Sequence, residues 1–142
     1  MTLDMAHTEA ETRPKALPSP YDTAASATTR FALELVAWSA GPIAVHRVTG
    51  SLPLAGLALA ALLAVPALFN TPGDKHQEGP IDTPGRARLA IEVGLSAVAV
   101  GAAALVWPAP VAAGVAATAV AAVISGARRA RWLFDGAPAI AR

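Results

Sequence analysis

The stretch RLAIEVGLSAVAVGAAALVW at residues 88–107 decides the fold class. Glu92 is the only charged residue in positions 89–107, and most of the others are aliphatic or small. A helix that crosses a bilayer needs about 20 mainly apolar residues. Lipid offers no hydrogen bonds to an unpaired backbone, so a run of this length must be helical if it lies in a membrane. The stretch therefore predicts a transmembrane helix.

Three further apolar runs accompany this stretch, so the chain is expected to be an all-α membrane protein. Its transmembrane domain covers residues 28–136 and is preceded by a polar tail. That tail, residues 1–27, carries charges and prolines, has no signal-peptide core and cannot bury enough apolar surface to fold. Residues 137–142 form a C-terminal tail. The predicted spans are residues 28–48, 51–69, 86–107 and 109–127.

The composition excludes several classes of function. Of the 142 residues 54% are hydrophobic and 15% are charged, against about 25% charged in a soluble domain. The net charge of +1 gives no basic face for nucleic acid. The chain has no cysteine, and it contains no phosphate-binding loop, dinucleotide fingerprint or Ser–His–Asp set. We therefore predict no catalytic residue and no cofactor, and an enzyme is the least favoured class.

The distribution of basic residues predicts an orientation in the membrane. If both tails and the loop at residues 70–85 share one side, that side holds ten of the eleven Lys and Arg residues, and only Arg47 lies opposite. The positive-inside rule then places both termini in the cytoplasm. The segment RRARWLF at residues 128–134 is either a basic, aromatic anchor on the inner leaflet or a plain stop-transfer flank.

A repeated motif suggests how the four helices are related. RFALEL at residues 30–35 and RLAIEV at residues 88–93 each place an arginine four positions before a glutamate, 58 positions apart. Each copy begins a hydrophobic run that is followed by a second run. The simplest explanation is a duplicated helical hairpin. Both copies start at the cytoplasmic face, so the two hairpins form a parallel repeat rather than an inverted one.

The charges of this repeat are expected to form a polar network just inside the cytoplasmic headgroups. Each arginine can pair with the glutamate of its own helix, one turn away. The alternative is a cross-pairing, in which Arg30 meets Glu92. By symmetry Arg88 then meets Glu34, and a mixed network of all four is the favoured arrangement. Such a network either fixes helix register or forms an ion or solute site. With the residues one turn further along each helix, its candidate members are Arg30, Glu34, Arg88, Glu92, Trp38 and Ser96.

The loop at residues 70–85 carries a second group of polar side chains. One histidine and two carboxylates in it could hold a metal ion loosely, but their spacing matches no known ligand pattern. A solvated turn is the favoured interpretation, because the loop is rich in Pro, Gly, Asn and Asp. We therefore predict no metal site. The residues concerned are Asp74, Lys75, His76 and Glu78.

Several of these segments together resemble a known family. RFALEL, RLAIEV, the FNTPGDK segment at residues 69–75 and RARWLFDGAP at residues 129–138 are similar to the YrdB-like family in its actinobacterial form. Its members are small bacterial integral membrane proteins with a domain of unknown function. The resemblance covers residues 30–138 and implies four helices in the cytoplasmic membrane, with no catalytic residue to carry over. The N-terminal tail and the extended loop at residues 74–85 depart from the family pattern.

Two functions remain open from the sequence. The first is a small inner-membrane protein that acts by helix–helix association, as a homo-oligomer or as an accessory subunit of another membrane protein. A stripe of small residues facing the lipid would favour it, and the alanine-rich residues 111–122 are the candidate. The alternative is a small-solute or proton- or cation-coupled transporter that uses Glu34 and Glu92. The sequence indicates neither a substrate nor a partner beyond the bilayer.

Overall fold

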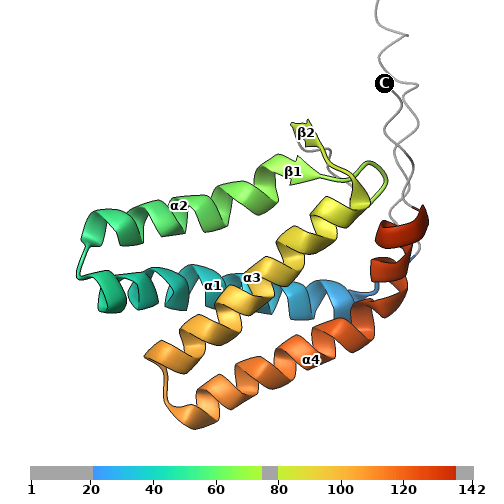
Figure 1. Cartoon of the computed structure of the whole chain (residues 1–142). Helices are drawn as coiled ribbons and strands as arrows, with labels where there is room; N and C mark the ends of the chain where they lie inside the picture. The colour runs from blue at the N-terminus through green and yellow to red at the C-terminus, as the bar shows by residue number, and fades with distance from the viewer. Residues whose placement is uncertain (1–20, 75–79, 137–142) are drawn as a thin grey trace, which may run out of the picture.

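The chain is almost entirely helical in a computed structural model that describes residues 21–74 and 80–136. A π-helical turn, η2 (Trp132–Gly136), follows the last α-helix, and two strands of two residues each, β1 (Phe69–Asn70) and β2 (Ile81–Asp82), pair in parallel between the second and third helices. The predicted all-α class is confirmed. The four α-helices are α1 (Ala24–Thr49), α2 (Leu52–Leu68), α3 (Gly85–Val106) and α4 (Ala109–Arg131) (Figure 1).

The helix boundaries follow local capping signals. The Thr23 side chain accepts a hydrogen bond from the backbone N–H of Ser26 at 3.2 Å, so α1 begins four residues before the predicted span. Gly50 ends α1 in the left-handed conformation, with φ of 69°, and its N–H bonds to the His46 carbonyl. The Ser51 hydroxyl then accepts from the Leu54 N–H and starts α2. These residues produce the predicted tight turn between the first two helices.

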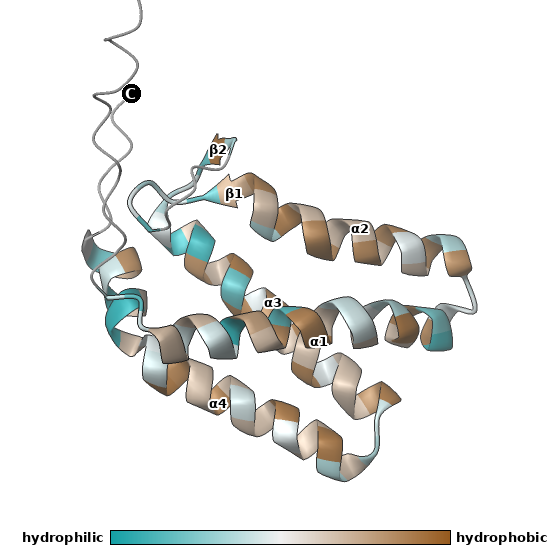
Figure 2. Cartoon of the chain, turned by 180° about the vertical axis from the view of Figure 1, so that it is seen from behind, coloured by the Kyte–Doolittle hydropathy of each residue, from teal (hydrophilic) through white to brown (hydrophobic). Residues whose placement is uncertain are grey.

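The four helices form two hairpins that point the same way. Figure 1 shows the α1–α2 turn and the α3–α4 turn at one end of the molecule, and Figure 2 shows the same arrangement from behind. The start of α1, the two strands and the end of α4 lie at the opposite end. α1 is the central helix, since it contacts α2, α3 and α4, whereas α2 and α3 touch little. Both first helices therefore begin at the same end, as expected for hairpins in parallel.

The core between α1, α3 and α4 consists mainly of small side chains. Ala37, Ala99 and Ala103 are completely buried and pack with Leu33 and Val115. Small residues let helix backbones approach closely, which is how helices pack where lipid leaves no hydrophobic driving force. The core is thus built from the alanine-rich composition that the sequence shows.

Two of the helical segments are long and apolar enough to cross a membrane. They are Gly85–Val106 and Ala109–Asp135. α2 is apolar but has only 17 residues, and α1 carries Arg30, Glu34 and Arg47. Of the four predicted spans, those in α3 and α4 therefore have the length and composition of a membrane-crossing helix. The spans in α1 and α2 stay predictions. α4 also continues four residues beyond the predicted span end at 127.

Several large apolar side chains are exposed, while two arginines are buried. Leu57, Val123 and Ile124 are each at least 66% exposed, while Arg88 and Arg129 are at most 2% exposed. Figure 2 shows white to hydrophobic colours along most of the helices, with hydrophilic colours near the start of α3 and the end of α4. A soluble domain buries arginine only rarely and exposes few large apolar side chains together.

Candidate functional site

Arg88 is the first member of a buried cluster of charges, hereafter the arginine–carboxylate cluster, made of Arg88, Glu92, Arg129 and Asp74. Its Nε donates to Glu92 Oε1 at 3.1 Å, one turn along α3. Its Nη1 donates to the carbonyls of Pro66 and Phe69, at 3.0 and 2.6 Å. Those carbonyls belong to the end of α2, where helix geometry leaves backbone oxygens without partners. Arg88 therefore caps α2 from α3.

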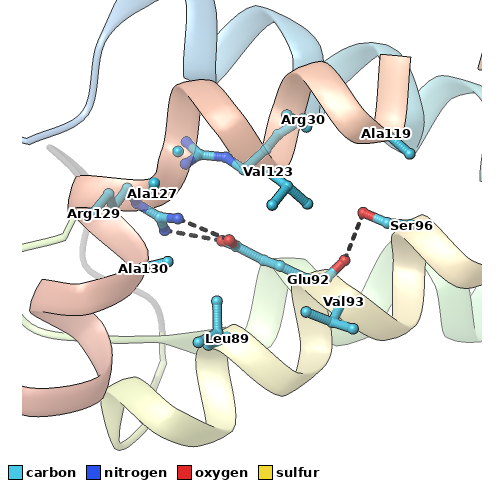
Figure 3. Close-up of a pocket in the computed structure, with 12 residues that line it drawn as sticks. Arg30, Leu89, Glu92, Val93, Ser96, Ala119, Val123, Ala127, Arg129 and Ala130 are labelled. Carbon is cyan, nitrogen blue, oxygen red and sulfur yellow. Dashed lines mark hydrogen bonds and ion pairs between the residues drawn. The ribbon is translucent and has the colours of Figure 1, made fainter. Parts of the chain in front are cut away.

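Arg129 lies between two carboxylates and binds each of them through two of its three guanidinium nitrogens. Its Nε donates to Asp74 Oδ1 at 2.7 Å, and its Nη2 donates to Asp74 Oδ2. Toward α3, Nη1 and Nη2 donate to the two Glu92 oxygens at 2.7 and 2.9 Å (Figure 3). Bidentate arginine–carboxylate pairs are the strongest and most directional of the charge-assisted hydrogen bonds. The pairs fix the end of α4 to α3 and to the α2–α3 connection.

The α2–α3 connection is folded so that Asp74 reaches the cluster. Thr71 Oγ1 donates to the Thr83 carbonyl at 2.9 Å, and the Thr83 N–H donates to the Asn70 carbonyl at 2.8 Å. These bonds close the base of the loop next to the β1–β2 pair. Gly73 then turns the chain with φ of 80°, and the next residue, Asp74, is buried at 3% exposure. Asp74 therefore differs from the prediction, which placed it in a solvated turn.

The cluster is electrically balanced. Its two guanidinium groups face its two carboxylates in the order Arg88, Glu92, Arg129 and Asp74. Burying any one of these charges alone would cost several kcal/mol, on the order of 3–5 for a pair that loses one partner. All four side chains are almost completely enclosed, with Glu92 the most exposed at 11%. The arrangement holds four elements together and leaves no carboxylate of the cluster unpaired.

The other copy of the repeat is used differently. Arg30 donates to Asp22 Oδ2 at 2.8 Å and to the Ser26 hydroxyl at 3.3 Å, both on the N-terminal side of α1. Glu34 is partly buried, and its side chain makes no ion pair or hydrogen bond with any residue in 21–74 or 80–136. Neither cross-pair of the predicted network is present in these ranges, because Arg88 and Glu92 bond to each other and to other partners.

The two remaining predicted members lie at different distances from the cluster. Ser96 donates from its hydroxyl to the Glu92 backbone carbonyl at 2.9 Å, so it follows the cluster along α3 (Figure 3). Trp38 donates from Nε1 to the Leu62 carbonyl at 3.1 Å and so joins α1 to α2. Its ring meets the Phe31 ring edge-on, with centroids 6.3 Å apart. Trp38 therefore supports helix packing and is not part of the cluster.

Sequence reasoning missed half of the cluster. Arg129 was interpreted as part of an anchor or a stop-transfer flank, yet it is 2% exposed. Its neighbour Arg128 is exposed and has no ion pair in the described part of the chain, as a flanking residue would. A signal existed in helical spacing, since Arg129 follows Ala119, Ala122 and Gly126 on one face. The partner Asp74 could not be found this way because it lies in a loop.

The described residues offer little chemistry beyond ion pairing. No three of their His, Asp or Glu side chains lie close enough to hold a metal ion. Lys75, His76 and Glu78, the other members of the predicted loop group, lie outside the described residues. The cluster has the construction of a structural clamp, with every charge opposed by another.

Comparisons with known proteins give no further assignment. No protein-family model matches the chain, and no curated protein and no solved structure matches it either.

Proposed function

We propose that this chain is a multi-pass integral protein of a bacterial cytoplasmic membrane, with four crossing helices and both termini in the cytoplasm. The observation that carries the proposal is the exposure of large apolar side chains together with the burial of two arginines. Large apolar residues such as Leu57 and Ile124 cover the outside, while the arginines Arg88 and Arg129 are enclosed. In lipid this order is the favourable one, because charges must be paired inside and apolar surface needs no cover.

The two ends of the molecule support the proposed orientation. All ion pairs of the described residues lie near the start of α1, the start of α3 or the end of α4. At the hairpin end, Arg47 donates to the Leu105 carbonyl at 2.9 Å. A bias of Lys and Arg to one side marks the cytoplasmic face. α2 spans about 26 Å at 1.5 Å per residue, which is near the lower limit for crossing a bilayer.

Within the membrane, the protein acts by helix–helix association as a homo-oligomer or accessory subunit. Gly94 and Gly101 lie two turns apart on α3, and a Cβ added to either would meet nothing within 4 Å. Glycine weakens a helix interior by about 1 kcal/mol relative to alanine. A glycine face left open by the chain itself suits the close approach of another helix. The exposed residues Ala90 and Ala97 extend this glycine face of α3.

The predicted stripe on α4 is a second surface of the same kind. Exposed small residues follow one another at helical spacing along it, and a Cβ at its glycine also meets nothing within 4 Å. Only 6% of the apolar window of this helix is buried inside the chain. α4 therefore presents more unoccupied surface to lipid or partners than α3. The exposed small residues are Ala113, Gly114, Ala117 and Ala121.

The proposal is tested first by membrane retention and then by oligomeric state. The wild-type protein is expected to stay in membranes washed with alkaline carbonate. After detergent extraction, Gly101→Leu is expected to weaken self-association, because a branched side chain separates backbones that must approach closely. Native mass spectrometry and chemical cross-linking in the membrane measure the change.

The matched control is Gly56→Leu on α2. Gly56 is also an exposed helix glycine at which an added Cβ would meet nothing within 4 Å, and it lies on α2, away from the glycine face of α3. This control is expected to associate as the wild type does. Release of the protein by carbonate would refute the membrane proposal. If Gly101→Leu and Gly56→Leu weakened self-association equally, the α3 face would be refuted as the association surface, and the membrane location would be unaffected.

A transporter is the second candidate, and one observation favours it. Glu34 is a partly buried carboxylate without a partner in the described ranges, and such residues in membranes are usually functional. It lines a cavity of about 10 Å³ with Arg30, Glu92 and Ser96, enough for one water molecule. Glu92 is held by two arginines, so Glu34 is the carboxylate that such a transporter would use.

A further inference from the structure

A groove runs between α3 and α4 that the arginine–carboxylate cluster does not fill. It measures about 460 Å³, within the range of about 300–1,000 Å³ that holds small ligands. Val93 and Val123 stand beside it, and both are more than 60% exposed (Figure 3). Its α4 wall consists mainly of alanine, valine and glycine side chains. The groove is therefore open to the surroundings of the protein and apolar for most of its lining.

Polar groups line the groove on one side of its apolar part. Glu92 and Arg129 lie there, bonded to each other, and Arg30 reaches in from α1 (Figure 3). A guanidinium has five N–H donors. Arg30 uses two of them, on Asp22 and Ser26, and the other three have no acceptor among the described residues. Arg30 can therefore bind an additional anion while it keeps its ion pair.

We propose that this groove binds one phospholipid with an anionic headgroup. An acyl chain lies along the alanine and valine wall, and the phosphate accepts hydrogen bonds from Arg30. The inference rests on the proposed membrane location, since only there is the occupant present at high concentration. Charge complementarity supports it, because Arg30 lies where the cytoplasmic headgroups are expected and retains free donors.

The groove is distinct from the glycine face proposed for helix association. On α3, Leu89, Glu92 and Ser96 line the groove, and Gly94 and Gly101 lie about 120–180° around the helix from them at 100° per residue. Val93 lies between the two faces, so a helix docked on the glycines would approach α3 from another side than the lipid. The lipid and the partner helix can therefore be separated by mutation.

The direct test is lipid binding to the full chain in detergent, measured by native mass spectrometry with phosphatidylglycerol. One molecule per chain is expected to bind tightly. Ala127→Phe places a ring in the groove. It is expected to weaken lipid binding about tenfold, because the ring occupies the space in which the acyl chain would bury its apolar surface. Ile124→Phe adds the same ring on an exposed part of α4, outside both the groove and the small-residue stripe, and is expected to leave binding unchanged.

The headgroup contact has its own pair of variants. Arg30→Gln removes the proposed phosphate ligand and is expected to weaken phosphatidylglycerol binding about tenfold. Asp22→Asn removes the ion-pair partner of Arg30 but keeps the cation, so it is expected to maintain or strengthen binding. Glycerol 3-phosphate has the phosphate without an acyl chain and is expected to show no binding at the same concentration.

A reporter on the surface covers the case in which the ring in the groove prevents folding. The chain has no cysteine, so a single cysteine can carry a fluorophore. Val123→Cys places it beside the groove, and Ile124→Cys places it outside, at nearly equal exposure of 73% and 71%. At one brominated phosphatidylglycerol per chain in detergent, only the fluorophore at position 123 is expected to be quenched.

The outcomes separate this inference from the proposed function. Equal weakening by both phenylalanines, or equal quenching at positions 123 and 124, would overturn the groove while the protein remained membrane-bound. Loss of lipid binding on Gly101→Leu but not on Ala127→Phe would assign the lipid to a helix interface instead. Release of the wild-type protein by carbonate would overturn the membrane location and the lipid site together.

Discussion

Two segments with nearly the same sequence, residues 30–35 in α1 and residues 88–93 in α3, have different surroundings. In α3 the arginine is 1% exposed and the glutamate binds two guanidinium groups. In α1 the arginine turns back to Asp22 and is 16% exposed on its side chain, while the glutamate has no partner in the described residues. The same motif thus forms a clamp in one hairpin and a local pair in the other.

The difference comes from what each motif meets. The α3 copy faces the end of α2, the folded loop at Asp74 and the end of α4, which together supply two carbonyls, a carboxylate and a second arginine. Among the described residues, the side-chain hydrogen bonds of the α1 copy come from Arg30 and go back to Asp22 and Ser26, near the start of its own helix. A charge pair becomes structural where several elements converge on it, because burial then requires every charge to be opposed.

Removing the central arginine should break the α3 copy and give the largest effect. Arg129→Gln leaves Asp74 without its cation and takes one of two cations from Glu92. The expected loss of stability is about 3–5 kcal/mol, the usual cost of leaving a buried charge unpaired. Unfolding in lipid nanodiscs, followed by circular dichroism, measures it.

The neighbouring arginine is the control for this variant. Arg128 is exposed and has no ion pair among the described residues, so Arg128→Gln is expected to change stability by less than about 0.5 kcal/mol. Similar losses for both variants would mean that the basic end of α4 matters only through its total charge. The clamp would then be refuted.

The two glutamates sharpen the comparison directly. Glu92→Gln is expected to cost about 3 kcal/mol, because Arg88 and Arg129 share its carboxylate. Glu34→Gln is expected to change stability by less than about 0.5 kcal/mol, or to raise it, since no ion pair is lost. The same nanodisc unfolding measures both, and the glutamine at position 34 is the matched control for that at position 92.

The two glutamine variants also distinguish the two candidate functions. If Glu34→Gln abolishes proton or cation flux in proteoliposomes while its stability is unchanged, the transporter becomes the favoured function. Absence of flux in the wild type would remove it. A large loss of stability in Glu34→Gln would contradict the asymmetry between the two copies.

Lysine substitutions at the arginines of the two copies are expected to give the smallest difference in stability. Arg88→Lys keeps the charge but cannot bond to Glu92 and to both α2 carbonyls at once, so the expected cost is about 1–3 kcal/mol. Arg30→Lys alters a partly exposed pair that contributes about 0–1 kcal/mol. Equal costs in the same unfolding measurement would show that neither copy depends on the shape of the guanidinium.

Much of the fold was predictable because it depends on local signals. The apolar runs predict the four helices, and the short gap between the spans ending at residue 48 and starting at residue 51 predicts a tight first turn. The direction of the two hairpins followed from the repeat. Hydrophobic length does not identify all four helices as membrane spans. Among the described residues, α3 and the segment formed by α4 and its extension are the helices long and apolar enough to cross a membrane. A short, wholly apolar helix such as α2 fits lipid or a partner equally well.

The site was predicted only where its members lie on one helix. Arg88 with Glu92 follows from spacing of four residues, and the structure contains this pair. Asp74 and Arg129 are 55 positions apart, and one of them sits in a loop among similar polar residues. Which loop carboxylate meets which arginine depends on how Gly73 turns the chain and on where α4 ends, and neither can be derived from periodicity.

The pairing of Asp74 with Arg129 also has a consequence for the order of assembly. A ribosome delivers the chain from its N-terminus, so Asp74 and Glu92 are synthesised well before the arginine that neutralises them. Until α4 is synthesised, Asp74 of a nascent chain lacks Arg129 and Glu92 can pair with Arg88 alone. A chain cut short before residue 129 is therefore expected to keep these two carboxylates incompletely neutralised.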